Sequence, residues 1–167
     1  MLNVRKIVLL ALLAAGALAL QVSLSFIPNV ELVTLWFLII GLSLSFKESV
    51  IIVFVFTLLE ALVWGFADWV LGYLWIWTVW ILIIRMLKPI LKDNAHHWAL
   101  LGALFGFLFG FLFAVQHAIL YGLNMGIVYW IRGISFDIIH AFSNYSLILI
   151  LFKPIYKVFN NLLRKWG

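Results

Sequence analysis

Four polar side chains stand close together near the C-terminal end of a chain that is otherwise strongly apolar. The segment RGISFDIIHAFSNY holds Arg132, Asp137, His140 and Asn144. On a helix that advances about 100° per residue, Asp137, His140 and Asn144 fall within about 60° of one another, so they share one face over two turns. A cation, an acid, an imidazole and an amide gathered in this way can bind a polar solute or relay protons.

The composition places these polar groups in a membrane. Of the 167 residues, 67% are hydrophobic and only 10% are charged, which is too little charge to cover a water-soluble core. The chain has no cysteine, which excludes disulfides, thiolate metal sites and a cysteine nucleophile. Its 11 basic residues are scattered between apolar runs, a pattern that favours membrane orientation over nucleic-acid binding.

Apolar runs long enough to cross the ~30 Å hydrocarbon layer predict six transmembrane helices. The expected spans are residues 6–25, 31–46, 49–67, 69–87, 98–120 and 128–152. These runs are apolar all round, whereas the strands of a membrane barrel alternate between polar and apolar residues. No linker or low-complexity segment divides the chain. We therefore predict an all-α integral membrane protein, with residues 1–167 forming a single transmembrane domain, a six-helix bundle.

Basic residues fall on one side of the predicted membrane. They precede the first span, lie in alternate connections or follow the last span: Arg5, Lys6, Lys47, Arg85, Lys88, Lys92, Lys153, Lys157, Arg164 and Lys165. By the positive-inside rule, both termini are predicted to be cytoplasmic. Only Arg132 breaks the pattern. A cleaved signal sequence ending near Ala17-Leu18-Ala19 is the alternative for the first span, and it would leave five spans in the same orientation.

Other spans carry polar and aromatic residues at a similar depth on the outer side. We expect these residues to line a substrate pocket together with Arg132, Asp137, His140 and Asn144, and they are Glu60, Trp64, Trp69, Tyr73, Trp77, His117 and Asn124. Trp69, Tyr73 and Trp77 recur on one face of the fourth span, where flat rings can stack on a planar ligand. The alternatives are ring packing in a dense core and internal ion pairs, such as Arg132 with Asp68 or Glu60.

The sequence contains no motif that predicts an enzyme. It has no zinc-ligand spacing, no nucleophile elbow and no nucleotide-binding glycine loop. We therefore expect no catalytic residue, no metal ion and no cofactor.

Small residues recur at four-residue intervals in two predicted spans. Ala11, Ala15 and Ala19 form a stripe in the first span, and Gly102, Gly106 and Gly110 form one in the fifth. Stripes of this kind allow helices to approach closely in lipid. We predict that the glycine stripe packs within the bundle, while the alanine stripe suits either an internal or an external helix.

The alanine stripe, the segment SFIPNVELVTLWFLIIGL and the six-span topology together resemble the S component of an energy-coupling factor (ECF) type vitamin transporter, an ABC importer of bacterial plasma membranes. The resemblance implies that Ala11, Ala15 and Ala19 dock on a transmembrane T component, which sits on two ATPase subunits. It also implies a water-soluble vitamin held near the outer surface and delivered when the S component topples. Individual ligand-binding residues do not carry over.

Stacked rings beside Arg132 and acidic groups suit a small heteroaromatic vitamin or precursor, such as hydroxymethylpyrimidine or a vitamin B6 form. Cobalamin and pantothenate are alternatives. A stand-alone proton-coupled carrier for a small solute, using Asp137 and His140 as relay groups, is a hypothesis from another class. A structural membrane subunit without a ligand is a third. A carrier would transport by itself, whereas an S component requires its partners.

Overall fold

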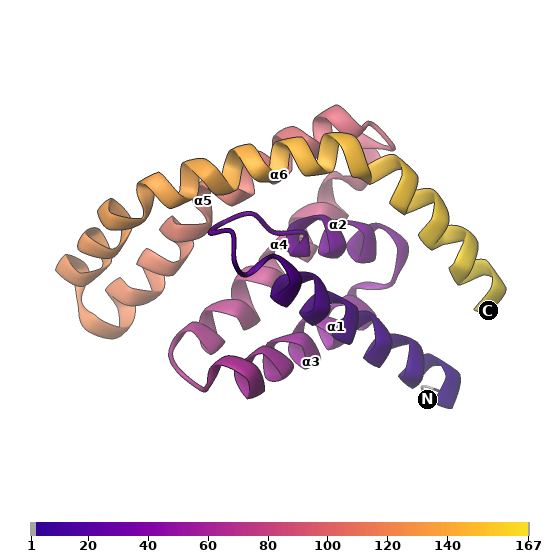
Figure 1. Cartoon of the computed structure of the whole chain (residues 1–167), viewed down its shortest axis with the longest axis horizontal. Helices are drawn as coiled ribbons and strands as arrows, with labels where there is room; N and C mark the ends of the chain where they lie inside the picture. The colour runs from indigo at the N-terminus through magenta and orange to yellow at the C-terminus, as the bar shows by residue number, and fades with distance from the viewer. Residues whose placement is uncertain (1–2, 167) are drawn as a thin grey trace.

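This computed structural model describes residues 3–166, which form six helices joined by short connections. They are α1 (Val4–Leu24), α2 (Val33–Ser43), α3 (Phe46–Trp64), α4 (Trp69–Leu91), α5 (Ala95–Tyr121) and α6 (Leu123–Trp166). The prediction of an all-helical protein is confirmed. Figure 1 shows α5 and α6 as a long antiparallel hairpin that lies across the group formed by α1 to α4.

Four helices, α1, α4, α5 and α6, are long and apolar enough to cross a bilayer, which indicates a membrane protein. The prediction for span 31–46 was wrong in length, because α2 has 11 residues and is only about 16 Å long at 1.5 Å per residue. α3 has 19 residues but holds three charged side chains, Lys47, Glu48 and Glu60. α6 has 44 residues and continues well past residue 152, the predicted end of the last span.

Local hydrogen bonds explain where α2 begins and ends. The Glu31 carboxylate accepts a hydrogen bond of 2.8 Å from the backbone N–H of Thr34, and this bond satisfies a free donor at the start of the helix. At the other end, Ser45 and Glu48 form a capping box that starts α3. The apolar run is therefore divided between two helices.

Two basic side chains of α4 complete the C-terminal end of α2. Arg85 donates to the carbonyl oxygen of Leu44 at 2.8 Å, and Lys88 donates to that of Leu42 at 2.7 Å. Cations at the end of a helix satisfy its last carbonyls and interact favourably with its dipole. These two residues hold α2 in the centre of the fold.

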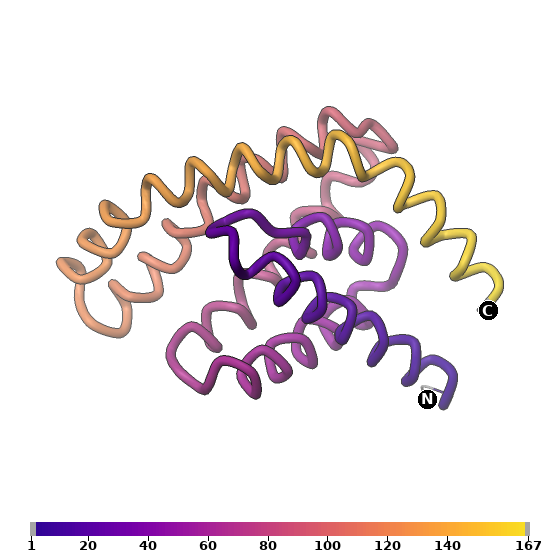
Figure 2. Tube along the Cα trace, in the orientation of Figure 1, coloured from indigo at the N-terminus to yellow at the C-terminus, as the bar shows by residue number. Residues whose placement is uncertain are grey.

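α6 contains Pro154, which removes one backbone hydrogen bond and bends a helix. The final, yellow part of α6 turns away from the line of the hairpin in Figure 2. Beyond the bend, Lys157, Arg164 and Lys165 are exposed. The extra length of α6 is thus a polar extension of the helix.

The chain runs back and forth between two ends. The N-terminus, the C-terminus and the α2–α3 and α4–α5 connections lie toward one end, on the right in Figures 1 and 2. We call it the charged end, because the basic residues outside Arg132 belong to these segments. The α3–α4 and α5–α6 turns lie toward the opposite end.

The glycine stripe of α5 faces α6, as predicted. A Cβ atom added at Gly106 would lie 3.0 Å from the backbone of His140. One added at Gly110 would collide with the Asp137 carboxylate. Glycine therefore lets the two helices of the hairpin approach closely, and it seats Asp137 directly against the backbone of α5.

Candidate solute-binding site

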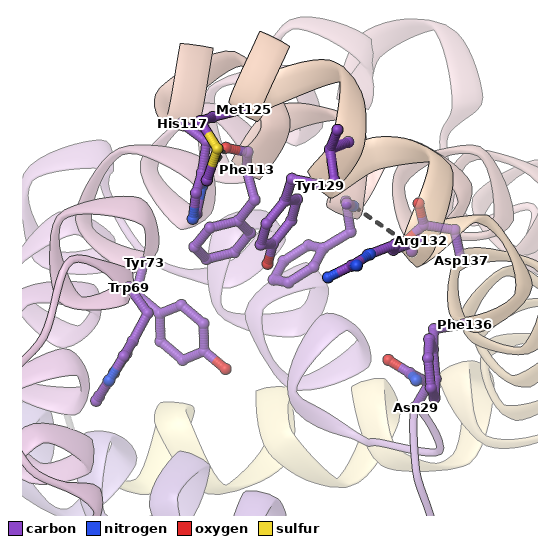
Figure 3. Close-up of a pocket in the computed structure, with 14 residues that line it drawn as sticks. Asn29, Trp69, Tyr73, Phe113, His117, Met125, Tyr129, Arg132, Phe136 and Asp137 are labelled. Atoms are coloured by element: carbon purple, nitrogen blue, oxygen red, sulfur yellow. Dashed lines mark hydrogen bonds between the residues drawn. The ribbon is translucent and has the colours of Figure 1, made fainter. Parts of the chain in front are cut away.

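A cavity of about 670 Å³ lies toward the end of the molecule opposite the charged end. We call it the main cavity. The start of α4, the last turns of α5, the first turns of α6 and the α1–α2 loop enclose it. It contains five of the residues predicted from the sequence, Trp69, Tyr73, His117, Arg132 and Asp137. Figure 3 shows Trp69 and Tyr73 on one side and Arg132 and Asp137 on the other.

Asp137 is only 6% exposed and uses only one of its two oxygens. Oδ1 accepts a hydrogen bond of 3.0 Å from the backbone N–H of Gly110. Oδ2 is buried and has no hydrogen-bond partner within residues 3–166. A buried polar atom without a partner is unfavourable by about 1–3 kcal/mol. A ligand that donates a hydrogen bond to Oδ2 would remove this penalty.

Arg132 reaches from α6 toward the centre of the cavity (Figure 3). The ion pairs with Asp68 or Glu60 that we considered from the sequence are not formed. Asp68 instead lies 3.4 Å from His117, and the ion pairs of residues 3–166 do not include Arg132. The guanidinium group is thus available to an acceptor or an anion in the cavity.

His117 is held as a wall of the cavity. Its Nδ1 lies 3.0 Å from the carbonyl oxygen of Phe113. Its Nε2 lies 3.4 Å from Oδ2 of Asp68, a residue at the end of the α3–α4 turn. Its ring stacks on Tyr129 with a centroid separation of 4.1 Å. These contacts hold His117 and Tyr129 together as one aromatic surface between α5 and α6.

His140 does not share the main cavity with Asp137. It lines a smaller cavity of about 200 Å³ together with Trp77, underneath the α1–α2 loop. Its Nε2 lies 3.1 Å from Oε1 of Glu31. Burial alone would raise the pKa of Glu31, but hydrogen bonds from His140 and Thr34 outweigh it and hold this pKa below its usual value. The pair ties the loop to α6.

The Glu31 pair predicts a dependence of stability on pH. The pKa of Glu31 is lower in the folded protein than its usual value of 4.5. The contribution of this carboxylate to the free energy of unfolding is therefore complete above pH 4.5, and it is lost as the pH falls through the pKa of the folded state. In detergent, wild type should melt at a higher temperature than Glu31→Gln at neutral pH, and the difference should shrink under acid conditions. Asp93→Asn, at an exposed site, is the control. A difference that stays constant with pH would contradict the assignment.

Four further predicted residues lie outside the main cavity. Asn144 is buried and donates to Oγ1 of Thr34 at 3.3 Å and to the carbonyl oxygen of Gly102 at 3.4 Å, so it joins helices. Glu60 and Trp64 line a third cavity of about 220 Å³. Asn124 is exposed and lines none of these three cavities.

Sequence reasoning missed much of the aromatic lining. The missed residues that matter most to the shape of the main cavity are Asn29, Phe109, Phe113, Tyr129 and Phe136. A signal for two of them was present, because Phe109 and Phe113 continue to His117 at four-residue intervals on one face of α5. Asn29 was not visible in this way, since its position depends on a backbone φ of 58° in the α1–α2 loop.

Comparison of the chain with protein-family models, with curated proteins and with solved structures finds no match. The long apolar helices indicate a helical membrane protein. Its aromatic cavity with a few convergent polar groups is a candidate site for a small molecule.

Proposed function

We propose that the chain is the substrate-binding S component of an ECF-type ABC importer, a six-helix membrane subunit that captures a vitamin or vitamin precursor at the outer surface. The observation that carries the proposal is the main cavity, in which Asp137 Oδ2 and the Arg132 guanidinium have no partner within residues 3–166. Ionisable groups in a membrane protein normally pair with each other or face a water-filled cavity or substrate path.

The size and lining of the main cavity support a small-molecule ligand. Its volume of about 670 Å³ lies within the usual range of roughly 300–1,000 Å³ for ligand pockets. Trp69, Tyr73 and Tyr129 offer aromatic surfaces to a flat ring, and Asp137 and Arg132 in the same lining offer an acceptor and a donor. A ligand with both a donor and an acceptor, such as hydroxymethylpyrimidine or a vitamin B6 form, fits this pattern.

Charge supports an orientation in which the main cavity opens to the outside. The basic residues gather at the charged end, which by the positive-inside rule is cytoplasmic together with both termini. The main cavity lies toward the other end. The protein would then be a multi-pass protein of the bacterial plasma membrane that receives its solute from outside the cell.

The surface of α1 supports an external helical partner. One face, with Leu10, Leu13, Ala14 and Ala17, is buried in the fold. The alanine stripe lies on another face, and Ala11, Ala15 and Ala19 are all exposed. A flat stripe of small residues that none of the helices in residues 3–166 covers permits close packing by another transmembrane helix. The proposed partner is the T component, with two ATPase subunits beneath it.

Co-purification tests the proposal. The tagged protein, isolated in mild detergent from its native cells, should bring with it the T component, the ATPases and a small heteroaromatic solute that mass spectrometry identifies. In liposomes, the protein alone should bind this solute without transporting it. Uptake by the protein alone under a pH gradient would contradict the proposal and would favour the proton-coupled carrier.

A further inference from the structure

Glu60 is a second buried acid without an ion-pair partner in residues 3–166, and it lies away from the main cavity. Its side chain belongs to α3 and is only 2% exposed. Oε1 has no hydrogen-bond partner within residues 3–166, and the ion pairs of these residues do not include Glu60. A carboxylate at such a place in a membrane protein is costly unless a cation or a donor meets it.

Aromatic rings surround this acid. Glu60 and Trp64, four residues apart on α3, line the cavity of about 220 Å³ together with Gln21 of α1 and with Trp69 and Tyr73 of α4. Trp69 and Tyr73 meet edge to face at a centroid distance of 5.2 Å. No lysine, arginine or histidine lines this cavity in the described part of the chain.

These side chains suit one ligand chemistry. The faces of tryptophan and tyrosine carry negative charge density and attract ammonium groups, most strongly when water is excluded. When it is ionised, the Glu60 carboxylate adds negative charge, so anions are disfavoured. A neutral apolar group would bury the carboxylate without supplying an opposite charge.

We propose that the cavity formed by Gln21, Glu60, Trp64, Trp69 and Tyr73 is a binding site for an ammonium group, carried by a small amine solute or by the headgroup of a membrane lipid. The site shares Trp69 and Tyr73 with the main cavity, but its acid is Glu60, which does not line the main cavity. Binding of an ammonium group there does not require the solute proposed for the main cavity.

Choline and 3,3-dimethylbutan-1-ol provide a matched pair of probes, because they have nearly the same shape and only choline is charged. Binding of radiolabelled choline should be measured on the full chain in nanodiscs of phosphatidylglycerol, a lipid without an amine. We expect saturable choline binding that unlabelled choline displaces and the neutral alcohol does not. Absence of choline binding, or equal displacement by the alcohol, would overturn the proposal.

Variants locate the site. Glu60→Gln keeps the size of the side chain and should weaken choline binding by roughly tenfold or more, as expected for loss of a charged partner. Trp64→Ala should also weaken it, and Trp64 is 56% exposed, so this second variant does not disturb a packed core. Glu48→Gln, at the other end of α3, is the control. Unchanged binding in correctly folded Glu60→Gln and Trp64→Ala would reject the site.

Nanodiscs of phosphatidylethanolamine distinguish the two sources of the ammonium group. A site for a lipid headgroup is already filled in this lipid, so choline should bind more weakly there than in phosphatidylglycerol. A site for a solute should bind choline equally in both. Because the probe is choline, a failure of the vitamin proposal for the main cavity would leave all of these outcomes unchanged.

Discussion

Asp137→Asn is expected to reduce the solute that co-purifies with the protein by roughly tenfold or more, as loss of a buried charged hydrogen bond would. The new amide can keep the hydrogen bond from Gly110 N–H to Oδ1. It replaces Oδ2, an acceptor without a donor, by an NH₂ group that is itself a donor. The polarity of the cavity wall is reversed with almost no change in shape. The measurement is the amount of solute per protein by quantitative mass spectrometry.

Arg132→Ala should cause a loss of similar size. It removes the guanidinium group, and Arg132 is the only lysine or arginine that lines the main cavity in residues 3–166. Asp93→Asn removes an acid from an exposed position near the charged end and serves as the control, with wild-type retention. Full retention of solute by both Asp137→Asn and Arg132→Ala would exclude the main cavity as the binding site.

Ala15→Trp is expected to abolish co-purification of the T component and its ATPases while solute binding stays close to that of wild type. Ala15 is exposed in the middle of the alanine stripe, so an indole there projects from α1 and holds a neighbouring helix away. The main cavity has no residue of the α1 helix in its lining, and the substitution leaves it intact. The measurement is the yield of partner subunits on tagged protein.

Leu62→Trp is the matched control for this docking prediction. Leu62 is 75% exposed on α3, so the variant adds the same indole to another lipid-facing surface. Partner subunits should be recovered with it as with wild type. Equal recovery with Ala15→Trp would show that the alanine stripe does not form the interface.

Hydrophobicity predicted the positions of the helices. The predicted bounds were wrong where a helix is shorter or longer than its apolar run. The run from residue 31 to residue 46 is almost uniformly apolar, so it does not reveal that α2 has only 11 residues. A signal for its end was present in Ser45 and Glu48, whose spacing matches a capping box. α6 runs past residue 152 because hydropathy marks where apolar residues end, whereas a helix can continue into water.

The site was predicted in part for a similar physical reason. Asp137, His140 and Asn144 share one face of α6, but Asp137 and Asn144 are seven residues and therefore about 10 Å apart along the axis. Over that distance the face meets different neighbours. Asp137 reaches the main cavity, His140 pairs with Glu31, and Asn144 bonds to Thr34. Helical periodicity predicts which residues share a face of α6. Which partner each of them contacts is decided by how α2 and the α1–α2 loop pack along that face.

Labelling of single cysteines tests the central claim most directly, because the chain has no cysteine of its own. Met125 lies at the edge of the main cavity and is 53% exposed, and Lys157 is exposed on the polar extension of α6. In intact cells, a membrane-impermeant maleimide should label Met125→Cys, more slowly when the co-purified solute is added, and should label Lys157→Cys only after permeabilisation. Labelling of Met125→Cys only after permeabilisation, or at a rate that the solute does not change, would contradict an outward-facing solute site.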